Sequence, residues 1–326
     1  MSSENQASVR KVVHVAVAVI RGDDGRILIA RRPNDKHMGG YWEFPGGKVE
    51  EGEFVTAALN RELKEELDVE ANQFRKLISI RHDYPDRSVC LDTWWANDII
   101  GQPRGNEGQE IRWVDLKELP ELNFPPANGP IVTAVLLPNR YMITGKFDVA
   151  AELLEKVSYQ LEQGVELIQF RAPWLDKGTY QHLARELHHL CRETGASLLL
   201  KGEPELLANS WCDGIHLTSK QLQQEGVDWR SASRSGQWLA ASCHNQEQID
   251  RAVSLGVDFV TLSPVMSTQA HPGCETLGME KAAELTERCP LPVFWLGGMQ
   301  LADQEQFIDR GAQGLAAIGA FWSQTY

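Results

Sequence analysis

The chain has 326 residues, of which 42% are apolar and 24% are charged. This composition is typical of a globular protein and excludes a disordered or collagen-like chain, and the length suits two domains of ordinary size. The net charge is −13, from 32 basic and 45 acidic residues, which argues against direct binding of duplex nucleic acid. An acidic protein can still handle phosphates when a divalent cation lies between its carboxylates and the substrate.

No run approaches eighteen consecutive apolar residues, so we expect no membrane-spanning segment. The polar start MSSENQASVRK lacks the apolar core of a secretory signal, and we expect a soluble cytoplasmic protein. None of the cysteines forms a C-x-x-C pair, so we expect reduced packing residues and neither a zinc site nor a disulfide framework. They are Cys90, Cys191, Cys212, Cys243, Cys274 and Cys289.

The first part of the chain is predicted to consist of strands and one helix. A β-branched run at 12–20 ends in a Gly-Asp-Asp-Gly turn and is followed by an apolar run at 26–30, which predicts a β-hairpin. Further strands are expected at 77–81, 89–95 and 111–114. Five of the fifteen prolines fall between residues 119 and 138. We therefore expect a domain boundary near 135–140, which gives domains 1–137 and 138–326.

Residues 54–67 are predicted to form an amphipathic helix. Its apolar face repeats every fourth residue, at Val55, Leu59, Leu63 and Leu67. Glu62, Glu65 and Glu66 place three carboxylates within about one turn, where like charges repel. A hard divalent ion with oxygen ligands would remove this repulsion, and Mg²⁺ fits best.

Two neighbouring features support a metal site on this helix. Arg61 is placed to pair with Glu65 and orient it. Gly46 and Gly47 precede the helix and allow a tight turn, so a backbone carbonyl can also face the metal.

Residues 47–69 match G-x5-E-x7-R-E-U-x-E-E-x-G-U, the Nudix box, at every fixed position except one. The departure is Asp68, where the family usually has glycine. Asp adopts the left-handed conformation at modest cost, so we expect the helix to end there as in the family. The segment thus resembles the Nudix hydrolases, which implies a Nudix α/β/α sandwich with a mixed sheet.

Residues 10–137 further resemble the MutT-type branch of this family through the segments 31–38, 42–47, 84–87, 105–109 and 124–128. This resemblance implies Mg²⁺-dependent hydrolysis, with Mn²⁺ as an alternative, of nucleoside triphosphates. The preferred substrate would be 8-oxo-dGTP, split to 8-oxo-dGMP and pyrophosphate, which sanitises the nucleotide pool and protects DNA. The substrate would contact Arg32, His37, Glu43, Phe44, Pro45, Gly46, Tyr84, Asp86 and Asn128. The metals would be held by the Gly46 carbonyl, Glu62, Glu65, Glu66 and Glu107.

The chemistry of these side chains agrees with that role. The Asn128 amide offers a donor beside an acceptor, which matches the O6 and N7–H edge of 8-oxoguanine. Alone, Asn128 would more often be a turn residue and His37 a surface loop residue, but their order relative to the box favours ligands. The catalytic set is expected to be Glu53, Arg61, Glu62, Glu65, Glu66 and Glu107. Glu62 is the favoured general base, followed by Glu53, and Glu107 competes with them.

After residue 140 the pattern changes to eight short apolar runs separated by amphipathic stretches. This alternation predicts a compact (β/α)₈ barrel, with a doubly wound open sheet as the alternative. The segment has fewer than about 190 residues, which is short for this fold, so we expect some helices to be reduced to a turn.

Residues 141–320 resemble thiamine phosphate synthase, a (β/α)₈ barrel. The matching segments are 141–144, 169–171, 213–217, 263–265 and 296–299. Gly297 and Gly298 suit a phosphate grip after a late strand, and Arg171 is placed to hold a diphosphate. Lys201 and Ser242 complete the expected phosphate-binding set, whose ligand would be a thiamine-related phosphate.

Several positions depart from the synthase pattern. The lysine of Q-x-R-x-K is replaced by Pro173, and the later T-x-T-K becomes the sequence at 268–271. The Asn-Asp pair after the third strand is Lys201-Gly202, and the acid after H-x-G-Q is Gln221. Both magnesium carboxylates are therefore absent, which favours a degenerate, ligand-binding or structural barrel. The alternative is a bifunctional thiamine-pathway protein whose Nudix half acts on a diphosphate intermediate.

Overall fold

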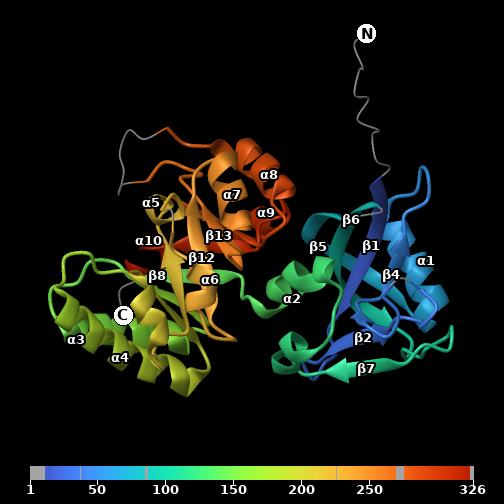
Figure 1. Cartoon of the computed structure of the whole chain (residues 1–326), viewed down its shortest axis with the longest axis horizontal. Coiled ribbons are helices and arrows are strands. Elements are labelled where there is room, and N and C mark those ends of the chain that lie inside the picture. Colours follow the sequence, from blue (N-terminus) through green and yellow to red (C-terminus); the bar gives the residue numbers. More distant parts are fainter. Residues whose placement is uncertain (1–11, 37, 85–86, 225, 269–274, 324–326) are drawn as a thin grey trace, which may run out of the picture. The chain divides into compact units, whose positions relative to one another are not determined.

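The computed structural model describes residues 12–36, 38–84, 87–224, 226–268 and 275–323. The chain divides into two compact units, Met1–Val132 and Thr133–Tyr326 (Figure 1). The division falls within helix α2 (Gly129–Leu136). In the second unit, Gln313 Nε2 donates hydrogen bonds to the carbonyls of Ala134 and Leu137, at 3.1 and 3.0 Å. The end of α2 is thereby held to the second unit, and the exact boundary at 137/138 stays a prediction.

The first unit contains a mixed sheet, as the resemblance implied. Its strand order is β4 (Gly46–Lys48), β1 (Val12–Ile20), β6 (Ser88–Ile100) and β5 (Glu70–Asp83). β1 runs parallel to β6, and the other pairs are antiparallel. A second, antiparallel sheet has the order β3 (Trp42–Glu43), β2 (Ile27–Arg31) and β7 (Ile111–Val114). The 3₁₀ turns η1 (Leu116–Glu121) and η2 (Pro126–Asn128) follow.

The predicted hairpin between the first two strands is wrong. β1 and β2 lie in different sheets and share only an isolated bridge between Arg21 and Ile27. β6 occupies one edge of β1 along its whole length, and β4 occupies the other edge at Val15, Ala16 and Val17. A strand inside a sheet has no free edge for a third partner, so β2 pairs elsewhere.

The predicted acidic helix is α1 (Val55–Leu67). Ala58, Leu59, Leu63 and Leu67 are fully buried and belong to a cluster that includes Ala16, Ala18 and Ile20 of β1. Each buried leucine contributes about 1.5–3 kcal/mol relative to an exposed one. This apolar face fixes which way the helix turns its carboxylates.

The helix ends at Asp68, in the left-handed conformation that was expected (φ 55°, ψ 36°). The Asp68 carboxylate also pairs with Lys64 Nζ at 2.9 Å and with Arg104 Nη2 at 2.5 Å. The side chain thus gains contacts that the glycine of the family pattern cannot make.

The second unit is a closed eight-stranded parallel barrel, which confirms the prediction and excludes the open sheet. Its strands are β8 (Arg140–Ile143), β9 (Leu167–Phe170), β10 (Ser197–Leu200), β11 (Gly214–Leu217), β12 (Trp238–Cys243), β13 (Phe259–Leu262), β14 (Val293–Leu296) and β15 (Gly314–Ala317). They are parallel neighbours throughout, and β15 closes the ring on β8.

Helices cover the outside of this barrel (Figure 1). The longer ones are α3 (Ala150–Glu162), α4 (Lys177–Thr194), α7 (Gln246–Ser254) and α8 (Gly278–Arg288). The shorter ones are η3 (Pro204–Ala208), α5 (Ser219–Leu222), α6 (Trp229–Ala232), η4 (Leu301–Asp303), α9 (Gln304–Ile308) and α10 (Gly319–Trp322). The expected reduction of some helices to about one turn is confirmed.

Strand alternation separates two apolar layers in the barrel. Residues such as Ile168 and Leu198 pack outward with the helices. Leu167, Leu199 and Phe259 form the inner cluster. Because side chains alternate along a strand, residues an even number of positions away from one of these three on the same strand also point inward.

The expectations for the cysteines and for membrane-spanning helices are compared with the described residues alone. In this part of the chain, the free cysteines Cys191, Cys212, Cys243 and Cys289 are buried and Cys90 is half-buried, and Cys274 lies outside it. No described helix combines the length and the apolar character needed to cross a bilayer.

Candidate functional site

The two glycines before α1 allow the strand and the helix to approach closely. A Cβ on Gly46 would lie 2.1 Å from the Ala16 carbonyl oxygen, and the φ angle of Gly46 is 148°. A Cβ on Gly47 would lie 2.1 Å from Cδ of Glu62. Any side chain at Gly47 would displace the Glu62 carboxylate. The pair therefore sets the position of this carboxylate at the end of β4.

Arg61 links three of the predicted catalytic carboxylates. Its guanidinium donates two hydrogen bonds of 3.0 Å to Glu53 and one of 2.6 Å to Glu62. The expected pairing with Glu65 is an ion pair at 3.7 Å, and the Glu65 side chain is 56% exposed. Arg61 thus orients Glu53 and Glu62 more firmly than Glu65. The Arg61 hydrogen bonds also lower the pKa of Glu53.

Glu66 is the buried member of the acidic set. Its Oε2 accepts a hydrogen bond of 3.1 Å from the backbone N–H of Gly46. Burial raises its pKa to about 8, and the Glu43, Glu62 and Glu107 carboxylates contribute to the rise. The Glu66 carboxyl group therefore favours its protonated form near neutral pH, and a bound cation would stabilise the charged form.

The segment around Glu107 is fastened to the C-terminal end of α1. Asn106 Nδ2 donates to the Glu65 carbonyl at 2.9 Å, and Gln109 Nε2 donates to the Glu66 carbonyl at 2.8 Å. Gln109 Oε1 also accepts from the Glu107 backbone N–H at 2.9 Å. These amides satisfy carbonyls that the helix end leaves unpaired. Sequence reasoning gave Asn106 and Gln109 no role, although both stand in the segment that matched the family.

The donor set suits a hard divalent cation. Glu62, Glu65, Glu66, Glu107 and the Gly46 carbonyl offer only oxygen atoms, which Mg²⁺ prefers. Within the described part of the chain, however, no three acidic, histidine or cysteine side chains converge closely enough to form a ready metal cage. Glu62 and Glu66 turn toward the two glycines, whereas Glu107 is exposed.

The predicted nucleotide-binding residues lie on several elements of the same unit. Arg32 pairs with Glu43, and burial raises the pKa of Glu43 despite the nearby guanidinium. The Pro45 carbonyl accepts from the backbone N–H of Ala18 at 2.8 Å and so ties the loop to β1. Tyr84 follows β5 and makes an edge contact with His82 at 4.5 Å. His37 and Asp86 lie outside the described residues.

Asn128 ends the short turn η2. Its backbone N–H donates to the Pro125 carbonyl at 2.8 Å, and the residue is half-buried. The structure gives its side-chain amide no hydrogen-bond partner among the residues that it describes. Four residues before it, Phe124 stacks on Phe44 with ring centroids 5.3 Å apart. The amide is thus free to meet a ligand.

In the second unit, the inner face of the barrel carries a hydrogen-bonded polar group. The Tyr141 hydroxyl lies 2.9 Å from His216 Nδ1, and His216 Nε2 lies 2.9 Å from Ser242 Oγ. Thr261 Oγ1 lies 3.4 Å from the same nitrogen. Burial, with a contribution from Lys201, holds the pKa of His216 well below its ordinary value. Of this group, only Ser242 was predicted from the sequence as a site residue. A polar residue at an inward strand position could have indicated the others.

The other predicted residues of the barrel lie just after its strands. Arg171 follows β9, Lys201 follows β10, and Gly297 and Gly298 follow β14. Both glycines have positive φ angles, 108° and 67°. A Cβ on Gly298 would lie 2.4 Å from the Ser267 carbonyl oxygen. The glycines are therefore required by close packing of two loops, whether or not a phosphate binds there.

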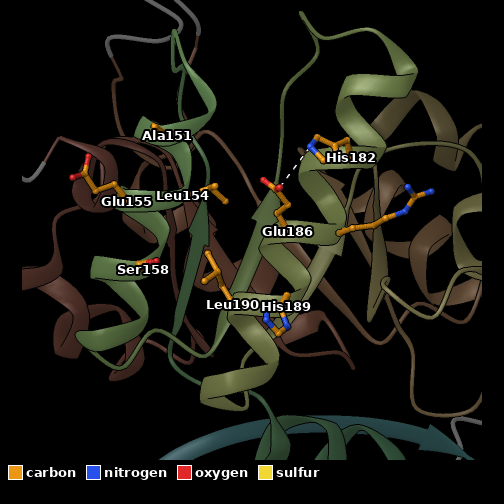
Figure 2. A pocket seen from close by; sticks show the side chains of 9 residues that line it. Ala151, Leu154, Glu155, Ser158, His182, Glu186, His189 and Leu190 are labelled. Atoms are coloured by element: carbon orange, nitrogen blue, oxygen red, sulfur yellow. Dashed lines mark ion pairs between the residues drawn. The ribbon is translucent and has the colours of Figure 1, made fainter.

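A surface pocket lies on the outer helical layer of the barrel, between α3 and α4 (Figure 2). His182 and Glu186 form an ion pair of 3.5 Å at its wall. The lining residues are Ala151, Leu154, Glu155, Ser158, His182, Arg185, Glu186, His189 and Leu190. None of them follows a barrel strand, so this pocket belongs to neither predicted site.

Known families match both units. A NUDIX domain family matches residues 16–134, and the thiamine monophosphate synthase family matches residues 140–321. An 8-oxo-dGTP diphosphatase of Escherichia coli (strain K12) is 39% identical over 122 residues, which are 37% of this chain and 95% of that protein. A CTP pyrophosphohydrolase of the same organism is 36% identical over 126 residues, 39% of this chain and 93% of that protein.

The barrel is similar to a putative thiamine-phosphate synthase of Geobacter sulfurreducens. The two are 31% identical over 182 residues, 55% of this chain and 84% of that protein. The chain therefore belongs to the Nudix hydrolase family through its first unit and to the thiamine monophosphate synthase family through its second. Its Nudix unit is an enzyme that hydrolyses diphosphate bonds.

Proposed function

We propose that the Nudix unit hydrolyses 8-oxo-dGTP to 8-oxo-dGMP and pyrophosphate and so removes an oxidised precursor from the nucleotide pool. The observation that carries this proposal is the acidic end of α1, where Glu62 lies against Gly47 and the buried Glu66 is held by the Gly46 N–H. The 39% identity to an 8-oxo-dGTP diphosphatase supports this choice of substrate.

Magnesium would be held by Glu62, Glu65, Glu66, Glu107 and the Gly46 carbonyl, all of which supply oxygen ligands. When bound, such an ion neutralises the triphosphate and lowers the pKa of an attacking water. Arg61 fixes Glu53 and Glu62 in place through its three hydrogen bonds.

Glu62 is the proposed proton acceptor for the attacking water. The Glu53 carboxylate already accepts two hydrogen bonds from Arg61 and one from the backbone N–H of Glu50, which lowers its pKa. These bonds weaken Glu53 as a base, whereas Glu62 accepts one bond from Arg61. Glu107 remains the competing base on the other side of the acidic set.

Asn128 is the proposed reader of the oxidised base. Its amide has a donor and an acceptor side by side, which match O6 and N7–H of 8-oxoguanine. Unmodified guanine carries an acceptor at N7, so the same amide would lose a hydrogen bond there. The described residues give the Asn128 amide no partner, and Phe124, four residues earlier, stacks on Phe44, which supports this assignment.

A second candidate substrate is a pyrimidine nucleoside triphosphate, which the similarity to a CTP pyrophosphohydrolase favours. The fused barrel favours a third, a pyrimidine diphosphate of the thiamine pathway. Initial rates with Mg²⁺ on 8-oxo-dGTP, dGTP, CTP and this diphosphate test all three. The proposal requires 8-oxo-dGTP to have the highest kcat/KM, and a higher value for either of the other candidates would overturn it.

For the barrel, we propose retained ligand binding without full synthase activity. The chain lacks both acidic residues that the synthases use for magnesium, at Gly202 and Gln221. Incubation of the full chain with the two synthase substrates and Mg²⁺ is expected to yield no thiamine phosphate. Product formation above the rate of a matched blank would restore the bifunctional alternative.

A further inference from the structure

The mouth of the barrel does not fit a magnesium ion. Gln221 Nε2 donates a hydrogen bond of 2.9 Å to the Gly202 carbonyl, so the two positions are tied directly to each other. Gln221 Oε1 accepts from the backbone N–H and the hydroxyl of Thr218, both at 3.0 Å. The Gln221 amide thus takes part in a capping box with Thr218 at the start of α5, and Gly202 has no side chain. Neither position offers the charged oxygen that Mg²⁺ requires.

Two cations lie beside these positions. Phe170 of β9 pairs in register with Leu200 of β10, and Arg171 and Lys201 are the next residues along the two strands. Arg171 lies four residues after the inward Leu167, and Lys201 lies two residues after the inward Leu199, so the alternation of side chains directs both inward. Both side chains therefore continue the inner face at the carboxyl ends of the strands, where barrel enzymes place their ligands.

The backbone at both cations is held firmly. The Thr144 hydroxyl accepts from the Arg171 N–H at 2.9 Å and donates to the Arg171 carbonyl at 3.2 Å. The Tyr180 hydroxyl accepts from the Lys201 N–H at 3.0 Å and donates to the Phe170 carbonyl at 2.9 Å. These side-chain bonds fix the starting points of the two cations relative to each other.

The described acidic residues do not compensate the charges of these two cations. No ion pair joins Arg171 or Lys201 to an acidic residue within the described ranges of the chain, and both residues are half-buried. Burial and the neighbouring Arg171 lower the pKa of Lys201 to about 8, and Lys201 in turn lowers the pKa of His216. Half-buried charges of the same sign are costly unless an anion compensates them.

Gln169, two residues before Arg171, carries a buried hydrogen-bond donor. Gln169 is 1% exposed, and none of the described residues accepts a hydrogen bond from its Nε2. Gln169 lies two residues after the inward Leu167, so its amide points into the barrel, on the same face as Arg171. Buried donors without an acceptor are rare in folded proteins. A ligand oxygen at the mouth would provide the missing acceptor.

We propose that the mouth of this barrel is a phosphate site that works without a divalent metal ion, in which the Lys201 ammonium takes the electrostatic place of that ion. Arg171 is the second cation, and the Gln169 amide donates from below. The ligand class is a phosphate or diphosphate ester. This inference concerns the second unit alone and does not depend on the function proposed for the Nudix unit.

Calorimetric titration of the full chain with inorganic pyrophosphate in excess EDTA tests the proposal. Binding is expected under these conditions, because none of the proposed donors needs a metal. Lys201→Met should weaken it at least about tenfold, the typical effect of losing a charged hydrogen bond. Lys201→Arg, which keeps the charge, should stay within about threefold of the parent. Inorganic phosphate in place of pyrophosphate shows whether the site prefers a mono- or a diphosphate.

The control variant is Lys281→Met on α8, because Lys281 is exposed and pairs with Glu284 at 2.8 Å. It removes the same charge from the chain and should leave pyrophosphate binding at the parent level. Chelation also prevents metal-bridged binding at the Nudix carboxylates, which repel pyrophosphate in its absence. Failure to bind either probe in EDTA would overturn the proposal. So would equal affinities for Lys201→Met and Lys281→Met.

Discussion

Arg61 shows how one side chain organises a charged site. Its guanidinium holds Glu53 and Glu62 together, whereas Glu66 is held separately by the Gly46 N–H. The sequence motif predicted which residues would gather on this helix face. It did not predict that Arg61 would bind Glu53 and Glu62 more closely than Glu65, because side-chain hydrogen bonds depend on the loop that carries Glu53.

Removing a carboxylate charge from this face should abolish most of the hydrolase activity. Glu62→Gln and Glu66→Gln each keep the side-chain volume, so the protein should fold. Each is expected to lower kcat/KM for 8-oxo-dGTP by at least about a hundredfold, since charges around such a reaction supply several kcal/mol of barrier reduction. Steady-state rates with Mg²⁺ check this, and near-parental turnover by either variant would contradict the assignment.

Asn128 offers a test of base recognition. Asn128→Ala removes the two-point contact to the oxidised edge and should reduce the preference for 8-oxo-dGTP over dGTP by about tenfold or more. Asn123→Ala is the matched control, because Asn123 is exposed in the same segment. The ratio of the two kcat/KM values is the measurement. Equal losses for both nucleotides would mean that Asn128 only shapes the loop.

At the scale of elements, the end of α1 shows how a departure from a family motif is tolerated. Asp68 adopts a left-handed conformation that favours glycine, but its carboxylate binds Lys64 and Arg104. Asp68→Ala keeps the backbone strain and removes these contacts, so it should lower stability. Asp68→Gly removes both strain and contacts, so its stability should lie closer to that of the parent. The urea concentration that halves hydrolase activity measures both changes, and a larger loss for the glycine variant would refute this balance.

The inner polar group of the barrel makes its stability depend on pH. His216 is buried and its pKa is held well below the ordinary 6.5, so the unfolded chain binds a proton that the folded chain excludes. Stability is fully present above pH 6.5 and decreases as the pH falls below that value.

Between pH 6.5 and 5.5, the parent should lose about 1 kcal/mol more than His216→Gln, which cannot take up this proton. His189→Gln is the control, because its side chain is 77% exposed and should follow the parent. Urea unfolding at several pH values, monitored by circular dichroism, gives the difference in slope. Parallel pH profiles for the parent and His216→Gln would contradict the buried neutral state.

Elements with a clear apolar period could be predicted from the sequence, whereas contacts between elements could not. The eight-stranded barrel was predicted correctly because each strand is a short apolar run bounded by polar loops, and α1 because its apolar and acidic faces have a helical period. The β1–β2 hairpin was wrong because strand pairing depends on which edges the remaining strands occupy. The Gln221–Gly202 bond also lay beyond sequence, since it joins loops after two different strands.

At the scale of the whole molecule, one chain carries two predicted phosphate sites of opposite electrostatic design. The Nudix site concentrates carboxylates around the buried Glu66, and burial together with these neighbours raises the pKa of Glu66 to about 8. The barrel mouth places Arg171 and Lys201 side by side without a described acidic partner. The first arrangement repels a phosphate unless a cation intervenes, and the second attracts it directly.

Chelation should therefore separate the two activities in the intact chain. Excess EDTA is expected to reduce hydrolysis of 8-oxo-dGTP by at least about a hundredfold, because the carboxylates then face the triphosphate without a compensating charge. Pyrophosphate binding at the barrel should persist in the same solution. Restored Mg²⁺ should recover hydrolysis, which distinguishes metal removal from denaturation. Hydrolysis that continues in EDTA would contradict the metal assignment for Glu62, Glu65, Glu66 and Glu107, whatever the barrel does.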